Sequence, residues 1–207
     1  FMLRSGPYGG GLNLLKGMSL SKLKANPHGI DLGELKPALP NALKTKDKQI
    51  QLNRAFFMAD LPRVNQHFFK DEPKNSARPF SLIGRRHVRS NNSWMHNSQR
   101  LVKGKNRCTV LIHPYDASAL KIDNAQTVKI ESRVGQVELP AEITEKIMQG
   151  VVSIPHGFGH NKQGTAWKIA EAHAGVSVND LSDEMQIDEL SGNAVLNGIP
   201  VSIQIVK

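Results

Sequence analysis

The chain has 207 residues, of which 39% are hydrophobic and 22% charged, as is ordinary for a globular protein with a real core. No apolar run approaches the roughly 20 residues that cross a bilayer, so no membrane span is expected. The single cysteine, Cys108, excludes an intrachain disulfide and a thiolate metal cluster.

The N-terminus "FMLRSGPYGGG" shows neither a long apolar core nor a small-residue cleavage site. We therefore expect no signal peptide and a cytoplasmic protein. Because the sequence does not begin with Met, we also expect it to be a piece of a longer chain.

The net charge of +9 is unevenly distributed. Residues 1–110 carry 20 Lys and Arg against 6 Asp and Glu, whereas residues 111–207 carry 7 against 12. A basic half joined to a mildly acidic half indicates an anionic partner on one side only. Nucleic acid, a phosphorylated cofactor and an acidic neighbouring domain all satisfy that condition.

Residues 1–78 have poor periodicity and many turn signals, among them "GPYGGG", "NPHG" and "KPALPNAL". They predict an irregular connector from a preceding domain. Within it, "SLSKLKA" predicts one helical turn capped by Ser19, and "RAFFMADLPRV" predicts a short helix that breaks before Pro62.

Residues 79–207 instead predict short strands separated by turns. "FSLIGRRHV", "CTVLIH", "VVSIP" and "GIPVSIQIV" are strand-like, and "QTVKIESR" with "VELPAEIT" predicts a hairpin. "PYDASAL" predicts a helix with Pro114 at its first position, "EKIMQG" a helical turn and "GTAWKIAEAHAG" a second helix. The fold class is therefore mainly β with short helices, as a compact barrel.

The stretch "RRHVRSNNSWMHN", residues 85–97, is rich in hydrogen-bond donors and follows a predicted strand. Its arginines suit phosphate oxygens, its asparagines and serines suit a purine or pterin edge, and Trp94 offers a stacking face. These residues favour a dinucleotide site, although neither GxGxxG nor GxxxxGK[ST] is present. A polar solvated turn explains the composition equally well.

Other candidate sites are weaker. "HGFGH" carries His156 and His160, but its glycines break a helix, so a loop in close contact with something is preferred to a zinc site. Cys108 follows Arg107 and begins an apolar strand, which favours a buried thiol over a nucleophile. In the acidic stretch 175–198, a carboxylate could accept from a guanine edge, or the stretch could be a solvated loop. We expect no catalytic residue and no metal ligand in this chain.

Together, "LIGRRHVRSNNSWMHN", "HPYDASALKIDNAQTVKIESRVGQVELPAEITEKIMQGVVSIPHGFGH", "VNDLSD" and "LSGNAVLNGIPVSI" resemble the C-terminal domain of molybdopterin oxidoreductases. These enzymes form the dimethyl sulfoxide reductase superfamily, and the resemblance is to formate dehydrogenase-like and assimilatory nitrate reductase-like members. It covers residues 80–206, and the preceding connector is similar as well.

The resemblance implies a double-psi β-barrel that closes over two molybdopterin guanine dinucleotides holding one molybdenum or tungsten. It implies that Asp116 caps a helix near the cofactor, that His156 and Gly157 approach a pterin, and that Asn179 and Asp180 lie near a guanine or pterin edge. The cofactor-binding residues that it implies are Gly84, Arg85, Arg86, His87, Arg89, Ser90, Asn91, Asn92, Ser93, Trp94, His96, Asp116, His156, Gly157, Asn179 and Asp180.

In this family the metal-ligating side chain and the iron–sulfur cysteines lie in earlier domains, so the resemblance implies that those domains are the partner of this piece. The resemblance does not define the redox partner, and it implies no nucleic-acid ligand. Two alternatives remain: a basic nucleic-acid-binding β-domain, motivated by the positive half, and a metal-dependent hydrolase built on "HGFGH".

Overall fold

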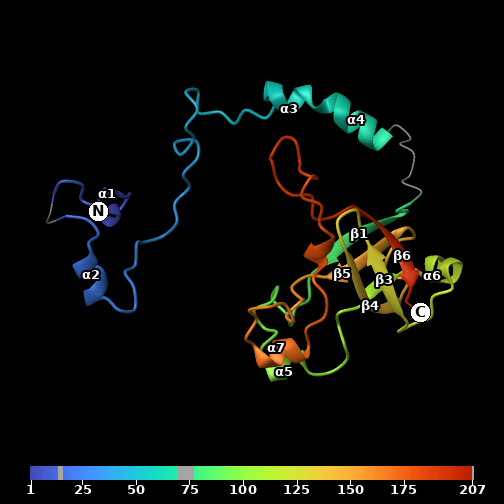
Figure 1. Cartoon of the computed structure of the whole chain (residues 1–207). Coiled ribbons are helices and arrows are strands. Elements are labelled where there is room, and N and C mark those ends of the chain that lie inside the picture. Colours follow the sequence, from blue (N-terminus) through green and yellow to red (C-terminus); the bar gives the residue numbers. More distant parts are fainter. Residues whose placement is uncertain (14–15, 70–76, 207) are drawn as a thin grey trace. The chain divides into compact units, whose positions relative to one another are not determined.

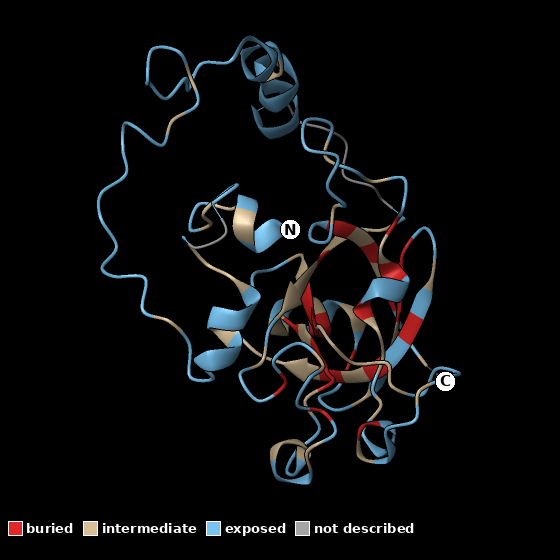
Figure 2. Cartoon of the chain, turned by 90° about the vertical axis from the view of Figure 1, so that its left-hand side faces the viewer, coloured by how far each residue is buried: buried red, intermediate tan, exposed pale blue. Residues whose placement is uncertain are grey.

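The computed structural model describes residues 1–13, 16–69 and 77–206, and these fall into two compact units, 1–54 and 55–207. The first unit contains two short helices, α1 (Met2–Ser5) and α2 (Leu20–Ala25). Ser19 caps α2 as predicted, because its side chain accepts a hydrogen bond from Lys22 N at 3.3 Å. Most of this unit is exposed (Figure 2).

The second unit opens with helices α3 (Ala55–Ala59) and α4 (Leu61–Phe69). The predicted break before Pro62 is confirmed, because Asp60 separates the two helices. Arg63 pairs with Asp60 at 2.6 Å across this junction. The second helix extends further than the sequence predicted.

Six strands then close into a barrel in the order β1-β5-β2-β4-β3-β6 (Figure 1). Two neighbouring pairs, β1–β5 and β2–β4, are parallel, and the remaining pairs are antiparallel. The alternating segments 127–143 form the predicted hairpin. The strands are β1 (Phe80–Arg85), β2 (Val110–Ile112), β3 (Thr127–Glu131), β4 (Gln136–Ile143), β5 (Val151–Pro155) and β6 (Ile199–Ile205).

The barrel interior is a continuous apolar core. Leu82, Ile112, Ile130 and Ile154 have no exposed surface, and each strand of the barrel carries red segments in Figure 2. Alternate positions of β3 and β4 are buried, as the pleat requires, whereas four consecutive residues of β5 are buried. The prediction of a mainly β barrel with short helices is confirmed.

The strand directions give the barrel two ends. At one, here called the loop end, β1, β3 and β5 finish and β2, β4 and β6 begin, so it carries segments 86–109, 132–135 and 156–198. The opposite end, here called the α6 end, carries segments 113–126 and 144–150. Figure 1 shows α5 (Gln99–Val102) and α7 (Lys168–Ala172) together and apart from α6 (Pro114–Leu120).

The predicted helices at 114–120 and near 168 are confirmed, with Pro114 at the first position of α6. The predicted helical turn in "EKIMQG" is wrong, because residues 144–150 form hydrogen-bonded turns that end at Gly150, whose φ is +72°. Among the described residues, no helix has the length and apolar character needed to cross a membrane.

Candidate functional site

The loop that follows β1 is curled by local hydrogen bonds. Both the amide and the hydroxyl of buried Ser90 donate to the carbonyl of His87, at 3.0 and 2.8 Å. Asn91 and Asn92 then take left-handed backbone conformations, with φ of 42° and 59°. Asn tolerates this region better than most residues, because its short polar side chain can bond locally. The donor-rich composition therefore builds an ordered turn.

A second loop, residues 156–160, packs directly on this turn. The His156 amide donates to Arg85 O at 3.0 Å. Gly157 has φ of +95°, and a Cβ at this position would lie 2.1 Å from the carbonyl oxygen of Asn92. Only glycine allows this approach. The prediction that "HGFGH" must lie close to another element is confirmed.

A contact between two histidines connects the two loops. His96 Nδ1 lies 2.6 Å from His160 Nε2, and the ring of Phe158 lies 4.4 Å from that of His96, centroid to centroid. Burial, followed by the neighbouring His160, lowers the pKa of His96 to about 4, so this ring is neutral at pH 7. His96 Nε2 is buried and has no hydrogen-bond partner among the described residues.

Arg85 points into the protein. Its guanidinium donates to the carbonyl oxygens of Ser153, Arg107 and Thr109, the last at 2.8 Å. Burial lowers its pKa. Because protein carbonyls already engage its nitrogens, Arg85 supports the base of the loop.

Arg86, Arg89 and Trp94 are among the exposed residues of the loop, and Trp94 is 77% exposed. After burial, the charge of Arg86 is the second factor that lowers the pKa of His156. Gly84 is not sterically required, because an added Cβ would meet only Asn197 Oδ1, at an ordinary 3.6 Å. The same oxygen accepts from the Gly84 amide at 2.8 Å.

Asn179 and Asp180 also lie at the loop end, in the 3₁₀ helix η1 (Val178–Leu181). Gly135 of the β3–β4 turn packs on the carbonyl of Asp180, and the Asp180 carboxylate pairs with Lys162. Ser177, just before η1, contacts Gly159 of the "HGFGH" loop. The structure thus brings segments 86–97, 156–160 and 177–180 to one end of the barrel.

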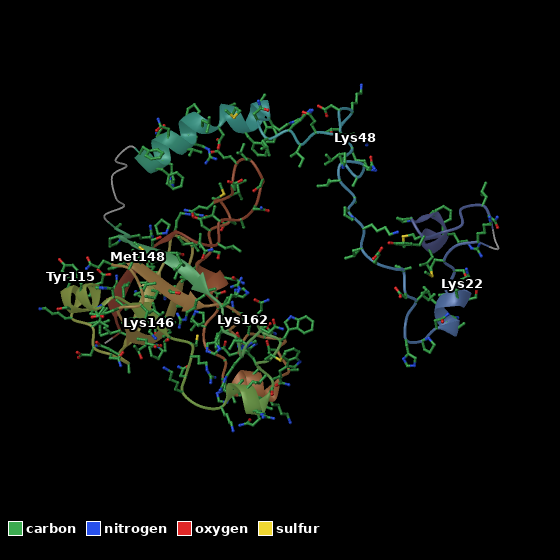
Figure 3. The ribbon with its side chains drawn as sticks, turned by 180° about the vertical axis from the view of Figure 1, so that it is seen from behind. Lys22, Lys48, Tyr115, Lys146, Met148 and Lys162 are labelled. Atoms are coloured by element: carbon green, nitrogen blue, oxygen red, sulfur yellow. The ribbon has the colours of Figure 1, made fainter. Side chains whose placement is uncertain are left out.

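Asp116 does not belong to this group. Its carboxylate accepts from the Gly150 amide at 2.8 Å at the α6 end, five β5 residues or roughly 16 Å from the loops. The helix cap is His113, whose Nδ1 accepts from Tyr115 N. The expectation that Asp116 caps α6 is therefore wrong, and its carboxylate lies at the end of the barrel opposite the loops. Figure 3 shows Tyr115 and Lys162 on different sides of the barrel.

A cavity of about 350 Å³ opens beside the loop turn. One wall of this cavity consists of four predicted site residues: His87, Arg89, Ser90 and His96. Sequence reasoning missed the rest, although the cations of "KGKNR" directly before buried strand β2 were a signal for it. The remaining wall residues are Leu101, Val102, Gly104, Lys105, Asn106, Arg107, Phe158, Ala172, His173, Ala174 and Gly175.

Two other predicted alternatives can be placed. Cys108 is 2% exposed, and burial raises the pKa of its thiol, so the buried-thiol interpretation is confirmed. Among the described residues, no group of three or more His, Cys, Asp or Glu could hold a metal ion. The His160 ring of "HGFGH" instead contacts His96 of the neighbouring loop.

Comparison with known families defines the class of protein. Residues 80–200 match the family described as "Molydopterin dinucleotide binding domain", which covers more than half of the chain. The chain therefore belongs to this family, and it is the dinucleotide-binding domain found in molybdopterin oxidoreductases. The match spans both loops of the site and ends within β6.

The chain is also similar to several curated proteins. It is 38% identical over 98 residues to the alpha subunit of an F420-dependent formate dehydrogenase of Methanocaldococcus jannaschii, covering 47% of this chain and 13% of that protein. It is 32% identical over 140 residues to the molybdopterin-containing arsenate respiratory reductase of Chrysiogenes arsenatis, covering 62% and 16%. A tetrathionate reductase polypeptide of Salmonella typhimurium is 27% identical over 112 residues, covering 46% and 11%.

Among solved structures, acetylene hydratase from Pelobacter acetylenicus is similar with a TM-score of 0.54 and 18% identity, covering 72% of this chain and 20% of that one. This likeness concerns the fold. The barrel is a double-psi β-barrel, as the sequence resemblance implied. The chain spans only 11 to 16% of the length of the three curated relatives.

Proposed function

We propose that residues 79–207 hold molybdopterin guanine dinucleotide within a larger molybdenum or tungsten oxidoreductase, and that residues 1–78 connect them to the preceding domains. In this proposal two such dinucleotides hold one metal, and the barrel closes over both. The observation that carries the proposal is the convergence, at the loop end, of exposed arginines, an exposed indole and close-packed backbone within the family match.

The residues present fit such a ligand. Arg86 and Arg89 are exposed at the loop and suit phosphate oxygens. Trp94 presents a flat apolar face on which a heteroaromatic ring can stack. The buried, unpartnered His96 Nε2 is a further group that could receive a hydrogen bond or donate one.

Each segment then has a binding task. Arg86 and Arg89 neutralise the pyrophosphate, and Trp94 covers a ring. His156 and Gly157 form the floor beneath a pterin, and Asn179 with Asp180 forms the edge that accepts from guanine. When bound, the cofactor would supply a metal that exchanges two electrons with the substrate, while these side chains fix its position and charge.

The parent enzyme that we propose is formate dehydrogenase-like, because a formate dehydrogenase is the relative with 38% identity. The metal-ligating side chain and an iron–sulfur cluster would come from the remainder of that parent. This piece alone would therefore not turn over. The remainder of the parent chain is the partner that the proposal requires.

Nucleic-acid binding has weaker support. The family match covers the barrel, and the exposed ring of Trp94 is next to polar neighbours of a kind that also suits a dinucleotide. Affinity for an oligonucleotide that fell steeply with salt would support the alternative.

Elemental analysis of the full-length parent tests the proposal directly. We expect about one molybdenum or tungsten per chain and about two guanosine monophosphates after acid release. Formate-dependent reduction of an electron-accepting dye by the metal-loaded parent tests the substrate assignment. A parent without metal and without nucleotide contradicts the proposed function.

A further inference from the structure

The cavity beside the loop turn has the dimensions of a binding site. Its volume of about 350 Å³ lies within the range of small-molecule sites. The turn at His87–Ser90 and the segment Gly104–Arg107 face it from two sides, and Phe158 and Gly175 contribute to the wall. Gly175 is sterically required there, because a Cβ would lie 2.7 Å from both Cys108 Sγ and the Phe158 ring.

The charged residues that line this cavity are all cationic. Arg89, Lys105 and Arg107 all line it, and none of its described lining residues is Asp or Glu. The Arg107 guanidinium is oriented by the carbonyls of Leu101 and Lys103, at 3.3 and 3.2 Å. Since these acceptors are uncharged, the positive charge of Arg107 is not cancelled.

The other two cations are also available to a ligand. Among the described residues, no hydrogen bond or ion pair engages the guanidinium of Arg89. Lys105 Nζ lies 3.9 Å from Glu142, but its side chain is 82% exposed. Such an exposed pair is weak, so an incoming anion can replace it.

His87 lines the cavity, and its pKa depends on these positive charges. Burial lowers its pKa, and the charges of Arg107, Arg89 and Arg85 lower it further, in that order. Its Nδ1 accepts from the amide of Arg89 at 3.2 Å, which fixes the ring beside that residue. An anion seated between the arginines would remove part of this repulsion.

We propose that this cavity binds the phosphate-bearing part of a ligand, with Arg89 and Arg107 as the charge partners of its phosphate oxygens. The inference rests on the proposed function and deepens it, because it adds Lys105 and Arg107 to the site. A phosphate group carries the multiple charge that three converging cations require. The apolar wall of Leu101, Val102 and Phe158 would contact the body attached to the phosphate.

The titration of His87 in the 207-residue chain tests the inference. The NMR signal of the His87 ring would be followed against pH alone and with inorganic phosphate, pyrophosphate or guanosine monophosphate. Sodium chloride at matched ionic strength controls for screening. We expect the pKa of His87 to rise with the phosphate compounds and not with chloride. The comparison of phosphate with the nucleotide shows whether the attached body adds affinity.

Variants locate the binding site. Arg107→Gln should weaken pyrophosphate binding about tenfold and raise the pKa of His87 in the ligand-free chain. Lys105→Gln should weaken binding less and leaves the fold undisturbed, because the Lys105 side chain is exposed and its one ion pair is weak. Lys146→Gln, at the α6 end (Figure 3), should have no effect.

The outcomes separate this inference from the proposed function. A rise in the pKa of His87 that Arg107→Gln abolishes supports the phosphate cavity. No rise, an equal rise with chloride, or a rise that both the Arg107 and Lys105 variants leave unchanged overturns it. If the parent contains metal and nucleotide while His87 does not respond, the cavity assignment alone fails. If His87 responds but the parent contains neither, the dinucleotide assignment fails and the phosphate cavity stands.

Discussion

The two ends of the barrel use their polar side chains differently. At the α6 end, side chains satisfy neighbouring backbone groups: Asp116 accepts from Gly150 N, and Asn124 accepts from Ile143 N at 2.9 Å. At the loop end, Arg86 and Arg89 extend to solvent, and His96 Nε2 has no partner among the described residues. We therefore propose that the ligand binds at the loop end, where polar groups are not already used by the protein.

The largest expected difference in stability is between alanine substitutions of two glycines, one at each end of the barrel. Gly157→Ala places a Cβ 2.1 Å from the Asn92 carbonyl oxygen, so the two site loops must move apart. We expect the free energy of unfolding to fall by more than about 3 kcal/mol. Gly150→Ala meets no atom within 4 Å and has only the strain of φ +72°, about 1 kcal/mol. Urea unfolding of both variants measures the difference, and equal losses would contradict the packing of Gly157 on Asn92.

The next largest difference in stability is expected between substitutions of two adjacent arginines. Arg85→Met leaves the carbonyls of Ser153 and Thr109 without their donor, and should cost about 3 kcal/mol of stability. Arg86→Met removes an exposed side chain and should cost less than about 0.5 kcal/mol. Thermal or urea unfolding checks both. A stable Arg85 variant would show that its guanidinium is not the support of the loop.

Local sequence patterns predicted much of the fold. The alternation in 127–143 predicted the hairpin, and Pro114 predicted the start of α6. The end of the barrel at which a segment lies depends on strand pairing between distant residues, such as Arg85 with Pro155. For that reason the position of Asp116 at the α6 end could not be predicted, although the helix around it was predicted correctly.

Acid should destabilise the loop end first. The pKa of His96 is about 4 in the folded chain and 6.5 for an unperturbed His, so the unfolded chain binds more protons between these values. Stability is therefore fully present above about pH 6.5 and falls as the pH drops toward 4, by about 2 kcal/mol. Unfolding curves across this range should lose part of their pH dependence in His96→Gln. An unchanged slope in that variant would contradict the burial of a neutral His96.

The smallest loss of stability is expected for a substitution at the α6 end. Asp116→Asn weakens one hydrogen bond, to the Gly150 amide at 2.8 Å, and should cost about 1 kcal/mol. We expect pyrophosphate affinity, measured by calorimetry, to be unchanged. A loss of affinity in this variant would restore Asp116 to the binding site.

Among the site residues, the sequence revealed chemical types better than their roles. Three arginines in "RRHVR" predicted an anion site, but burial of Arg85 depends on acceptors in β5 and in the segment before β2. Arg107 could not be linked to His87 from sequence alone, because twenty residues separate them and only the barrel brings both to one cavity. The Asn92 and Gly157 contact is non-local in the same way.

The most direct test compares the two ends of the barrel in the full-length parent. Acid-released guanine nucleotide would be quantified for the unmodified parent, for Arg86→Gln combined with Arg89→Gln, and for Asp116→Asn. We predict about two nucleotides per chain in the parent and in the Asp116 variant, and a clear loss in the double arginine variant. Equal nucleotide content in the parent and the arginine variant would contradict the central claim that the loop end binds the dinucleotide.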